Sequence, residues 1–196
     1  LEYFRGSGED PYPVIRFYIG TVLNTRTGEW YATLRNAVMG ENPVKAPTDA
    51  RPTQNYIQDG DTLVFYGNTV EGQNIDINYN LTIRSSYSDE NADGTRHGNA
   101  CTATLSNGAG ITVAAGKTVT FGGTGTTAAD GIQGTVTGTT GGLTLNGAAG
   151  GSNIITNNGT LHLRSDVTLA NAKKYGVSHQ GDQFHLYEGA KFTGNG

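Results

Sequence analysis

The chain has 196 residues, which suits one domain of ordinary size, and it is 35% hydrophobic and 15% charged with 30 glycines. A net charge of −4 without a basic cluster argues against nucleic acid as a partner, and no apolar run is long enough for a membrane span. The one cysteine, Cys101, rules out a disulfide within the chain, so we expect a buried structural thiol.

The amino-terminal part, residues 1–61, is predicted to be a capping segment. Residues 11–23 are rich in β-forming side chains and predict one or two strands. Residues 29–39 carry apolar side chains at helical spacing, which predicts one short helix. Three prolines between residues 40 and 58 predict a loop. The helix is well placed to cover the open edges of the strands that follow.

Residues 62–196 consist of short runs with apolar residues at alternate positions, bracketed by Asn and Gly. Such alternation indicates half-buried strands. Equivalent positions recur after 18 residues from Leu143 to Leu161 and after 23 residues from Leu161 to Phe184. This interval is too short for a strand–helix–strand unit and suits one turn of a three-faced helix of strands. We therefore predict an all-β fold, a right-handed parallel β-helix or solenoid with a short amino-terminal helical cap, truncated at its carboxyl end.

Several segments resemble a known group of proteins. Residues 30–38, 59–65 and 80–84 look like the opening of bacterial right-handed parallel β-helix surface proteins, and residues 174–195 resemble their adhesin-like repeat. The resemblance implies a non-catalytic, secreted, adhesin-like module on the bacterial cell surface. Its expected partners are a glycan or an extracellular host or matrix protein, and further coils of the same chain. Pectin-degrading lyases share this architecture, so the alternative is a polysaccharide lyase or glycoside hydrolase on a β-helix.

A polar stretch between residues 85 and 100 contains half of a calcium-loop motif. Asp89, Asn91 and Asp93 supply side-chain oxygens at the spacing of such loops, and Thr95 supplies a carbonyl. The twelfth position is Ala100, where a complete motif has Glu. Two interpretations follow, a weak calcium loop or a solvated turn, and the missing Glu favours the turn. No other cofactor is expected.

An enzyme on this fold would need clustered acids in one groove. The candidate carboxylates are scattered at about one per coil and form no paired motif, so no catalytic residue is assigned. These candidates are Asp76, Asp130, Asp166, Asp182 and Glu188.

Two histidines occupy the central position of similar strand sequences, Leu-His-Leu and Phe-His-Leu. Alternation places the flanking apolar side chains inside and both His162 and His185 outside on one face. If the two strands are neighbours in register, the imidazoles lie about 5 Å apart. We favour an exposed ladder over a shared metal site, because no Asp or Glu joins the pair at zinc spacing.

Overall fold

The computed structural model describes residues 2–4, 14–16, 20–44, 57–86, 100–123, 142–149 and 151–195. Within these residues there are 18 short strands and one helix, which confirms the predicted all-β class. Strands β1 (Glu2–Phe4) and β2 (Val14–Arg16) form an antiparallel pair of their own. The other strands form three sheets, which we name after a central strand of each.

The β10 sheet contains, in spatial order, β16 (Tyr175–His179), β13 (Asn153–Asn157), β10 (Ile111–Val113) and β7 (Ile75–Ile77). The β11 sheet contains β17 (Gln183–Leu186), β14 (Thr160–Leu163), β11 (Thr118–Phe121), β8 (Leu81–Ser85), β5 (Asp61–Phe65), β3 (Val22–Asn24) and β4 (Trp30–Tyr31). The β12 sheet contains β18 (Lys191–Thr193), β15 (Val167–Ala170), β12 (Leu143–Asn146), β9 (Cys101–Leu105) and β6 (Thr69–Glu71).

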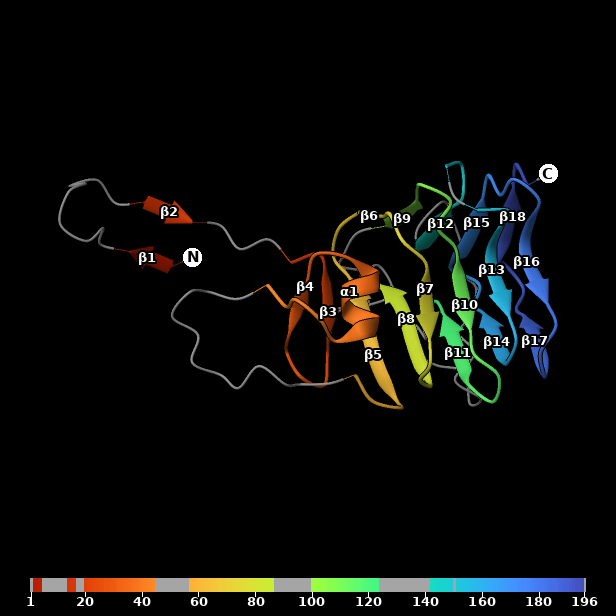
Figure 1. Ribbon diagram of the computed structural model, residues 1–196, viewed down its shortest axis with the longest axis horizontal. Coiled ribbons are helices and arrows are strands. Elements are labelled where there is room, and N and C mark those ends of the chain that lie inside the picture. The colour runs from red at the N-terminus through yellow and green to blue at the C-terminus, as the bar shows by residue number, and fades with distance from the viewer. Residues whose placement is uncertain are drawn as a thin grey trace, which may run out of the picture.

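From β5 onward, consecutive strands visit the three sheets in a fixed order, and from β8 onward each pairs in parallel with the strand three places earlier. A strand triplet is one strand from each sheet. The triplets are β7–β9, β10–β12, β13–β15 and β16–β18. In Figure 1 they follow one another along the long axis toward the carboxyl terminus. Paired side chains on one outer face of a sheet therefore come from positions about 20 to 44 residues apart in the chain.

The core lies between the sheets and is built from columns of inward side chains. One column crosses Leu63, Ile83, Phe121 and Leu163 on four paired strands of the β11 sheet, and all four are at most 1% exposed. Because side chains alternate along a strand, the outward positions between them form polar columns of mostly Thr. The apolar alternation seen in the sequence is thus explained by burial of one face only.

Asparagines at the corners join neighbouring triplets. Asn68, Asn74 and Asn80 each precede a strand, at three different corners between the sheets. Each side-chain Oδ1 accepts a hydrogen bond from a backbone N–H of the next triplet, at or just before the pairing strand. The donors are Thr102 at 2.8 Å, Gly110 at 3.0 Å and Thr118 at 2.8 Å, respectively.

The amino-terminal end of the three sheets is covered by β3 and by a helix that is shorter than the sequence predicts. Helix α1 spans only Leu34–Met39, so the predicted start at Glu29 is wrong. Trp30 and Tyr31 instead form strand β4 and pair antiparallel with β3. Thr33 caps the helix, its Oγ1 accepting from the Asn36 N–H at 3.1 Å. Sheet pairing of two aromatic residues therefore outweighs their helical spacing.

Candidate functional site

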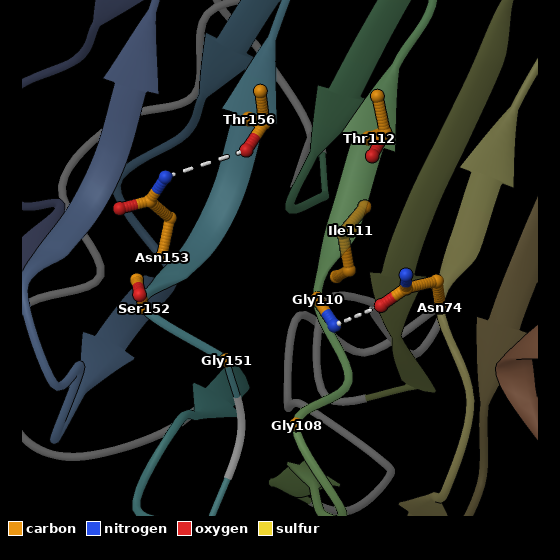
Figure 2. Close-up of a pocket in the computed structure, with 9 residues that line it drawn as sticks. All are labelled: Asn74, Gly108, Gly110, Ile111, Thr112, Gly151, Ser152, Asn153 and Thr156. Atoms are coloured by element: carbon orange, nitrogen blue, oxygen red, sulfur yellow. Dashed lines mark hydrogen bonds between the residues drawn. The ribbon is translucent and has the colours of Figure 1, made fainter.

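A shallow hollow of about 190 Å³ lies on the outer face of the β10 sheet, where three strands begin (Figure 2). Three segments form it: the turns into β7, β10 and β13, and the first residues of β10 and β13. Its lining consists of Asn74, Gly108, Gly110, Ile111, Thr112, Gly151, Ser152, Asn153 and Thr156. The hollow thus draws on three successive triplets, and its residues are up to 82 positions apart in the chain.

Glycines form one side of this hollow because the backbones approach closely there. A Cβ at Gly151 would lie 2.8 Å from the Gly108 carbonyl oxygen, and a Cβ at Gly110 would lie 3.2 Å from the Asn153 carbonyl oxygen. The Gly151 N–H donates to the Ala109 carbonyl at 2.8 Å, which holds the two turns together. Larger residues at these positions would push the turns apart and change the shape of the hollow.

Hydrogen-bonding groups in the hollow are incompletely used by the protein. Asn153 Nδ2 points toward Thr156 Oγ1 at 3.5 Å, whereas Asn153 Oδ1 is buried without a hydrogen-bond partner in the described part of the chain (Figure 2). Asn74 Oδ1 is engaged by the Gly110 N–H, which leaves its Nδ2 as a donor facing solvent. Thr112 lies beside Thr156 in the strand register, so two hydroxyls share this face. A ligand here would meet both donors and acceptors.

The hollow carries no charged side chain. The nearest charged position in the strand register is Asp76, which is exposed and pairs with Thr112 on the outer face of the same sheet. An uncharged set of amides and hydroxyls next to the apolar Ile111 suits a neutral, hydroxyl-bearing ligand better than an ion. The volume holds about six waters at about 30 Å³ each, and it is smaller than the roughly 300–1,000 Å³ of drug-sized pockets. It would therefore accommodate one small unit of a larger ligand.

The predicted histidine ladder is present on the outer face of the β11 sheet. His162 and His185 are register partners on β14 and β17, and their rings are parallel within 7° with centroids 4.5 Å apart. The Tyr187 hydroxyl lies 3.0 Å from His162 Nδ1, and the Arg164 guanidinium lies 4.2 Å from the centre of the Tyr187 ring. This confirms the predicted register and face of the two histidines.

The electrostatics of this ladder favour the neutral form of His162. Partial burial, the neighbouring His185 and the charge of Arg164 together lower the pKa of His162 below its usual value of 6.5. His185 Nε2 lies 2.9 Å from the Gln183 side-chain oxygen. No group of three or more His, Cys, Asp or Glu side chains is placed to hold a metal ion in the described residues.

The candidate carboxylates do not converge on a groove in the part of the chain that the structure describes. Asp76 is exposed on the β10 sheet, Asp182 is exposed before β17, and Glu188 is exposed before β18. Asp166 is 5% exposed, and its carboxylate accepts the Gly123 N–H at 3.0 and 3.1 Å. The Asp166 carboxylate therefore holds the backbone of the turn that follows β11. Asp130 lies outside the described residues.

Two further predictions concern Cys101 and calcium. The Cys101 thiol is buried as expected and donates to the Phe65 carbonyl at 3.4 Å. Burial raises its pKa to about 11, against the opposing effect of a backbone hydrogen bond from Ser86, so the thiol is unreactive at neutral pH. Asp89, Asn91, Asp93 and Thr95, the residues of the predicted calcium loop, lie outside the described residues.

A wider hollow of about 450 Å³ lies between α1 and the turn after β6. Its one acid, Glu71, is buried and accepts the Leu34 N–H at 2.8 Å and the Arg35 N–H at 3.1 Å. Glu71 thus joins the helix to the β12 sheet, and we regard this hollow as part of the join. The other lining residues are Thr33, Asn36, Val70, Gly72, Gln73 and Asn107.

Comparison of the chain with protein-family models, with curated proteins and with solved structures gives no match. Among the described residues, no helix is long and apolar enough to cross a membrane. The residues of the hollow on the β10 sheet are not predicted as a site by the sequence. The signal that was present is an Asn, Gly or Ser directly before each strand and an outward Thr on β10 and β13, and it gains meaning only once the strand register is known.

Proposed function

We propose that the chain is a right-handed parallel β-helix that acts as a non-catalytic, adhesin-like module on the outside of a bacterial cell and binds a glycan in the hollow of the β10 sheet. The observation that carries the proposal is the uncharged, partly unsatisfied set of amides and hydroxyls contributed by three successive triplets. Glycans present many hydroxyls, each both donor and acceptor, which suit the Asn74 amide and the Thr112 and Thr156 hydroxyls.

Handedness follows from a general rule for parallel strands. Connections between neighbouring parallel strands of one sheet are right-handed in about 98% of cases. Here each such connection passes through the other two sheets before it returns. The cell-surface location rests on the resemblance of residues 174–195 to adhesin-like repeats, and the low charge and single cysteine are compatible with it.

The test is a glycan array followed by titration of the glycans that bind. Replacing Thr112 and Thr156 together by Val keeps the shape of both side chains and removes two hydroxyls. At about 0.5–1.5 kcal/mol for each hydrogen bond, affinity should fall about fivefold or more. The matched control replaces Thr144 and Thr168, which are outward register partners on the β12 sheet, by Val and should leave affinity unchanged.

The same glycans should also be screened for release of reducing sugars and unsaturated products. Binding without turnover, weakened only by the change in the hollow, is the result expected of an adhesin. Turnover would favour the polysaccharide lyase or hydrolase. Equal loss of affinity in the variant and in the control would place the glycan elsewhere and remove the basis of the proposal.

A further inference from the structure

Strand β6 has a backbone edge without a hydrogen-bonded partner in the described part of the chain. It is the outermost member of the β12 sheet and pairs with β9 on one side only. The Glu71 carbonyl accepts the Ser106 N–H at 2.9 Å, so the backbone groups of Glu71 face β9. Neighbouring residues of a strand direct these groups to opposite sides, so the N–H and C=O of Val70 face away from β9.

This edge borders the hollow of about 450 Å³ that lies between α1 and the turn after β6. Val70 belongs to the lining, and its side chain is 64% exposed. Helix α1 packs against β6, but among the described residues no hydrogen bond joins the helix to Val70. The volume of the hollow falls within the roughly 300–1,000 Å³ of ligand sites, so a ligand has room beside the unpaired backbone groups of Val70.

The one acid of this hollow is already bound by the protein. Glu71 is buried, and its two carboxylate oxygens accept the Leu34 and Arg35 N–H groups at 2.8 and 3.1 Å. Thr33 Oγ1 accepts the next N–H of the helix, that of Asn36. The N–H groups of the first helical turn are therefore taken, and a ligand here would bind side chains of the helix and not its end.

Four polar side chains of the lining, in contrast, have no hydrogen-bond or ion-pair partner in the described residues. They are the Arg35 guanidinium and the amides of Asn36, Gln73 and Asn107. Because Glu71, the other charged residue of the lining, is only 1% exposed, a ligand would meet the positive charge of Arg35 alone. The hollow is therefore a positive site on a chain whose net charge is −4.

These groups match the chemistry of a peptide end. A strand edge supplies a backbone donor and acceptor that pair with an extended peptide. Amide side chains offer both a donor and an acceptor, which suits further peptide groups. The planar donors of a guanidinium match the two oxygens of a carboxylate. The described lining has no accessible acid that would hold a free amino group, so the carboxyl end of a peptide fits better than its amino end.

We propose that this hollow binds the carboxyl-terminal end of an extended peptide, which pairs with the edge of β6. The peptide backbone pairs with the N–H and C=O of Val70, its terminal carboxylate lies on Arg35, and its remaining peptide groups meet the three amides. The proposal does not rest on glycan binding in the hollow on the β10 sheet, because the two hollows share no residue.

The probe is a five-residue peptide of alternating Thr and Val, acetylated at its amino end, because these residues favour strands. It is titrated once with a free carboxyl terminus and once with a terminal amide, and the backbone amide resonances of the chain are followed by NMR. Shifts should appear at residues 33–36, 70–73 and 107. Loss of the carboxylate should lower affinity about tenfold or more, as expected for charge-assisted hydrogen bonds.

Two variants with the same change in net charge test the role of Arg35. Arg35→Gln should bind the acid and the amide forms of the peptide equally weakly, because the group that tells them apart is gone. The backbone N–H that binds Glu71 is kept, so the fold should persist. Lys173→Gln, at an exposed position after β15, is the matched control and should still prefer the acid form about tenfold or more.

Two further variants test the strand edge. Val70→Pro removes the N–H of the edge at a kind of position where proline is tolerated in sheets. It should lower affinity for both forms of the peptide about twofold to tenfold, the value of one hydrogen bond. Val70→Thr keeps the N–H and the branched side chain, so it should bind both forms as the unaltered chain does.

Several results would overturn the proposal. They are no shift with either form of the peptide, equal affinity of the unaltered chain for the two forms, and equal affinity of Val70→Pro and Val70→Thr. Glucuronate, which has a carboxylate and hydroxyls but no peptide group, is titrated in parallel, and tighter binding of this sugar would also overturn it. Shifts confined to residues 110–112 and 151–156 would place the peptide in the hollow on the β10 sheet and exclude the edge of β6.

Discussion

Single asparagines at the corners explain why the strand rhythm of the sequence keeps returning to this residue. Asn has a short side chain with an acceptor that reaches the backbone of a neighbouring turn. Asn68, Asn74 and Asn80 use it at three different corners, each toward the next triplet. The strand ladders alone would leave these N–H groups without a partner in the protein, so each asparagine adds one hydrogen bond between neighbouring triplets.

Replacing Asn80 by Ala should therefore destabilise the chain by about 0.5–1.5 kcal/mol, the net value of one hydrogen bond. The bond at risk runs from the Thr118 N–H to Asn80 Oδ1 at 2.8 Å. Asn78→Ala is the matched control, because Asn78 is exposed and makes only a 3.5 Å contact with the Asp76 carbonyl. Urea denaturation measures both changes. Equal stability of the two variants would show that the corner bond contributes nothing.

Asp61 is a buried carboxylate that several hydrogen bonds hold in place. It is 2% exposed and accepts hydrogen bonds from Asn24 Nδ2 at 2.8 Å, the Gln58 N–H at 3.0 Å and Arg26 Nη2 at 3.1 Å. Burial by itself would raise the pKa of Asp61, but these hydrogen bonds and the charge of Arg26 outweigh it and lower that pKa below the usual value of 3.8. The ionised form is therefore the stable one in the fold.

Asp61→Asn should cost about 1–3 kcal/mol of unfolding free energy at pH 7, because it removes charged hydrogen bonds from a buried site. The folded pKa lies below the unfolded pKa of about 3.9, so the contribution of Asp61 is present above that pH and is lost as pH falls through the folded value. The stability gap between wild type and variant should shrink in that window. Asp182→Asn, at an exposed carboxylate, is the matched control and should leave stability at pH 7 nearly unchanged.

At the scale of elements, the pairing of β14 with β17 also makes stability depend on pH. The cause here is that positive charge on His162 is disfavoured, whereas negative charge on Asp61 is favoured. His162 and His185 stack across this pair of strands, and protonating one places a positive charge beside a second imidazole and Arg164. The pKa of His162 is lowered in the fold, so its contribution to stability is present above the unfolded value of about 6.5 and is lost as pH falls through the folded value.

His185→Gln should raise the pKa of His162 toward 6.5, because one of the groups that disfavour its charge is gone. The shift should be partial, since burial is the largest cause and remains. Titration of the imidazole resonances by NMR measures it, with His179 as the internal reference because it belongs to another sheet. An unchanged pKa of His162 would mean that the stacked ring has no electrostatic effect.

Predictability from sequence also differs among elements, for physical reasons. The short strands and the register of His162 with His185 follow from alternation and spacing, because burial of one face imposes a period of two. The helix start does not follow, because pairing of Trp30 and Tyr31 with β3 decides it and that contact is not local. The hollow on the β10 sheet is hidden for the same reason, since it joins residues near 74, 111 and 153.

For the whole molecule, stacking makes the stability of each triplet depend on having a neighbour on both sides. Leu163 and Leu186 are the same residue type at paired positions of the same column, one 1% and the other 53% exposed. Comparing substitutions at the two positions therefore measures how much stability a covering neighbour adds. Inner triplets should contribute far more per apolar residue than the last one.

Leu163→Ala should cost about 2–5 kcal/mol, the range for a buried Leu that leaves a cavity, whereas Leu186→Ala should cost much less because half of the side chain already faces water. Urea denaturation measures both unfolding free energies. Equal costs would show that Leu186 is already covered, and the stacking argument would be wrong at that end.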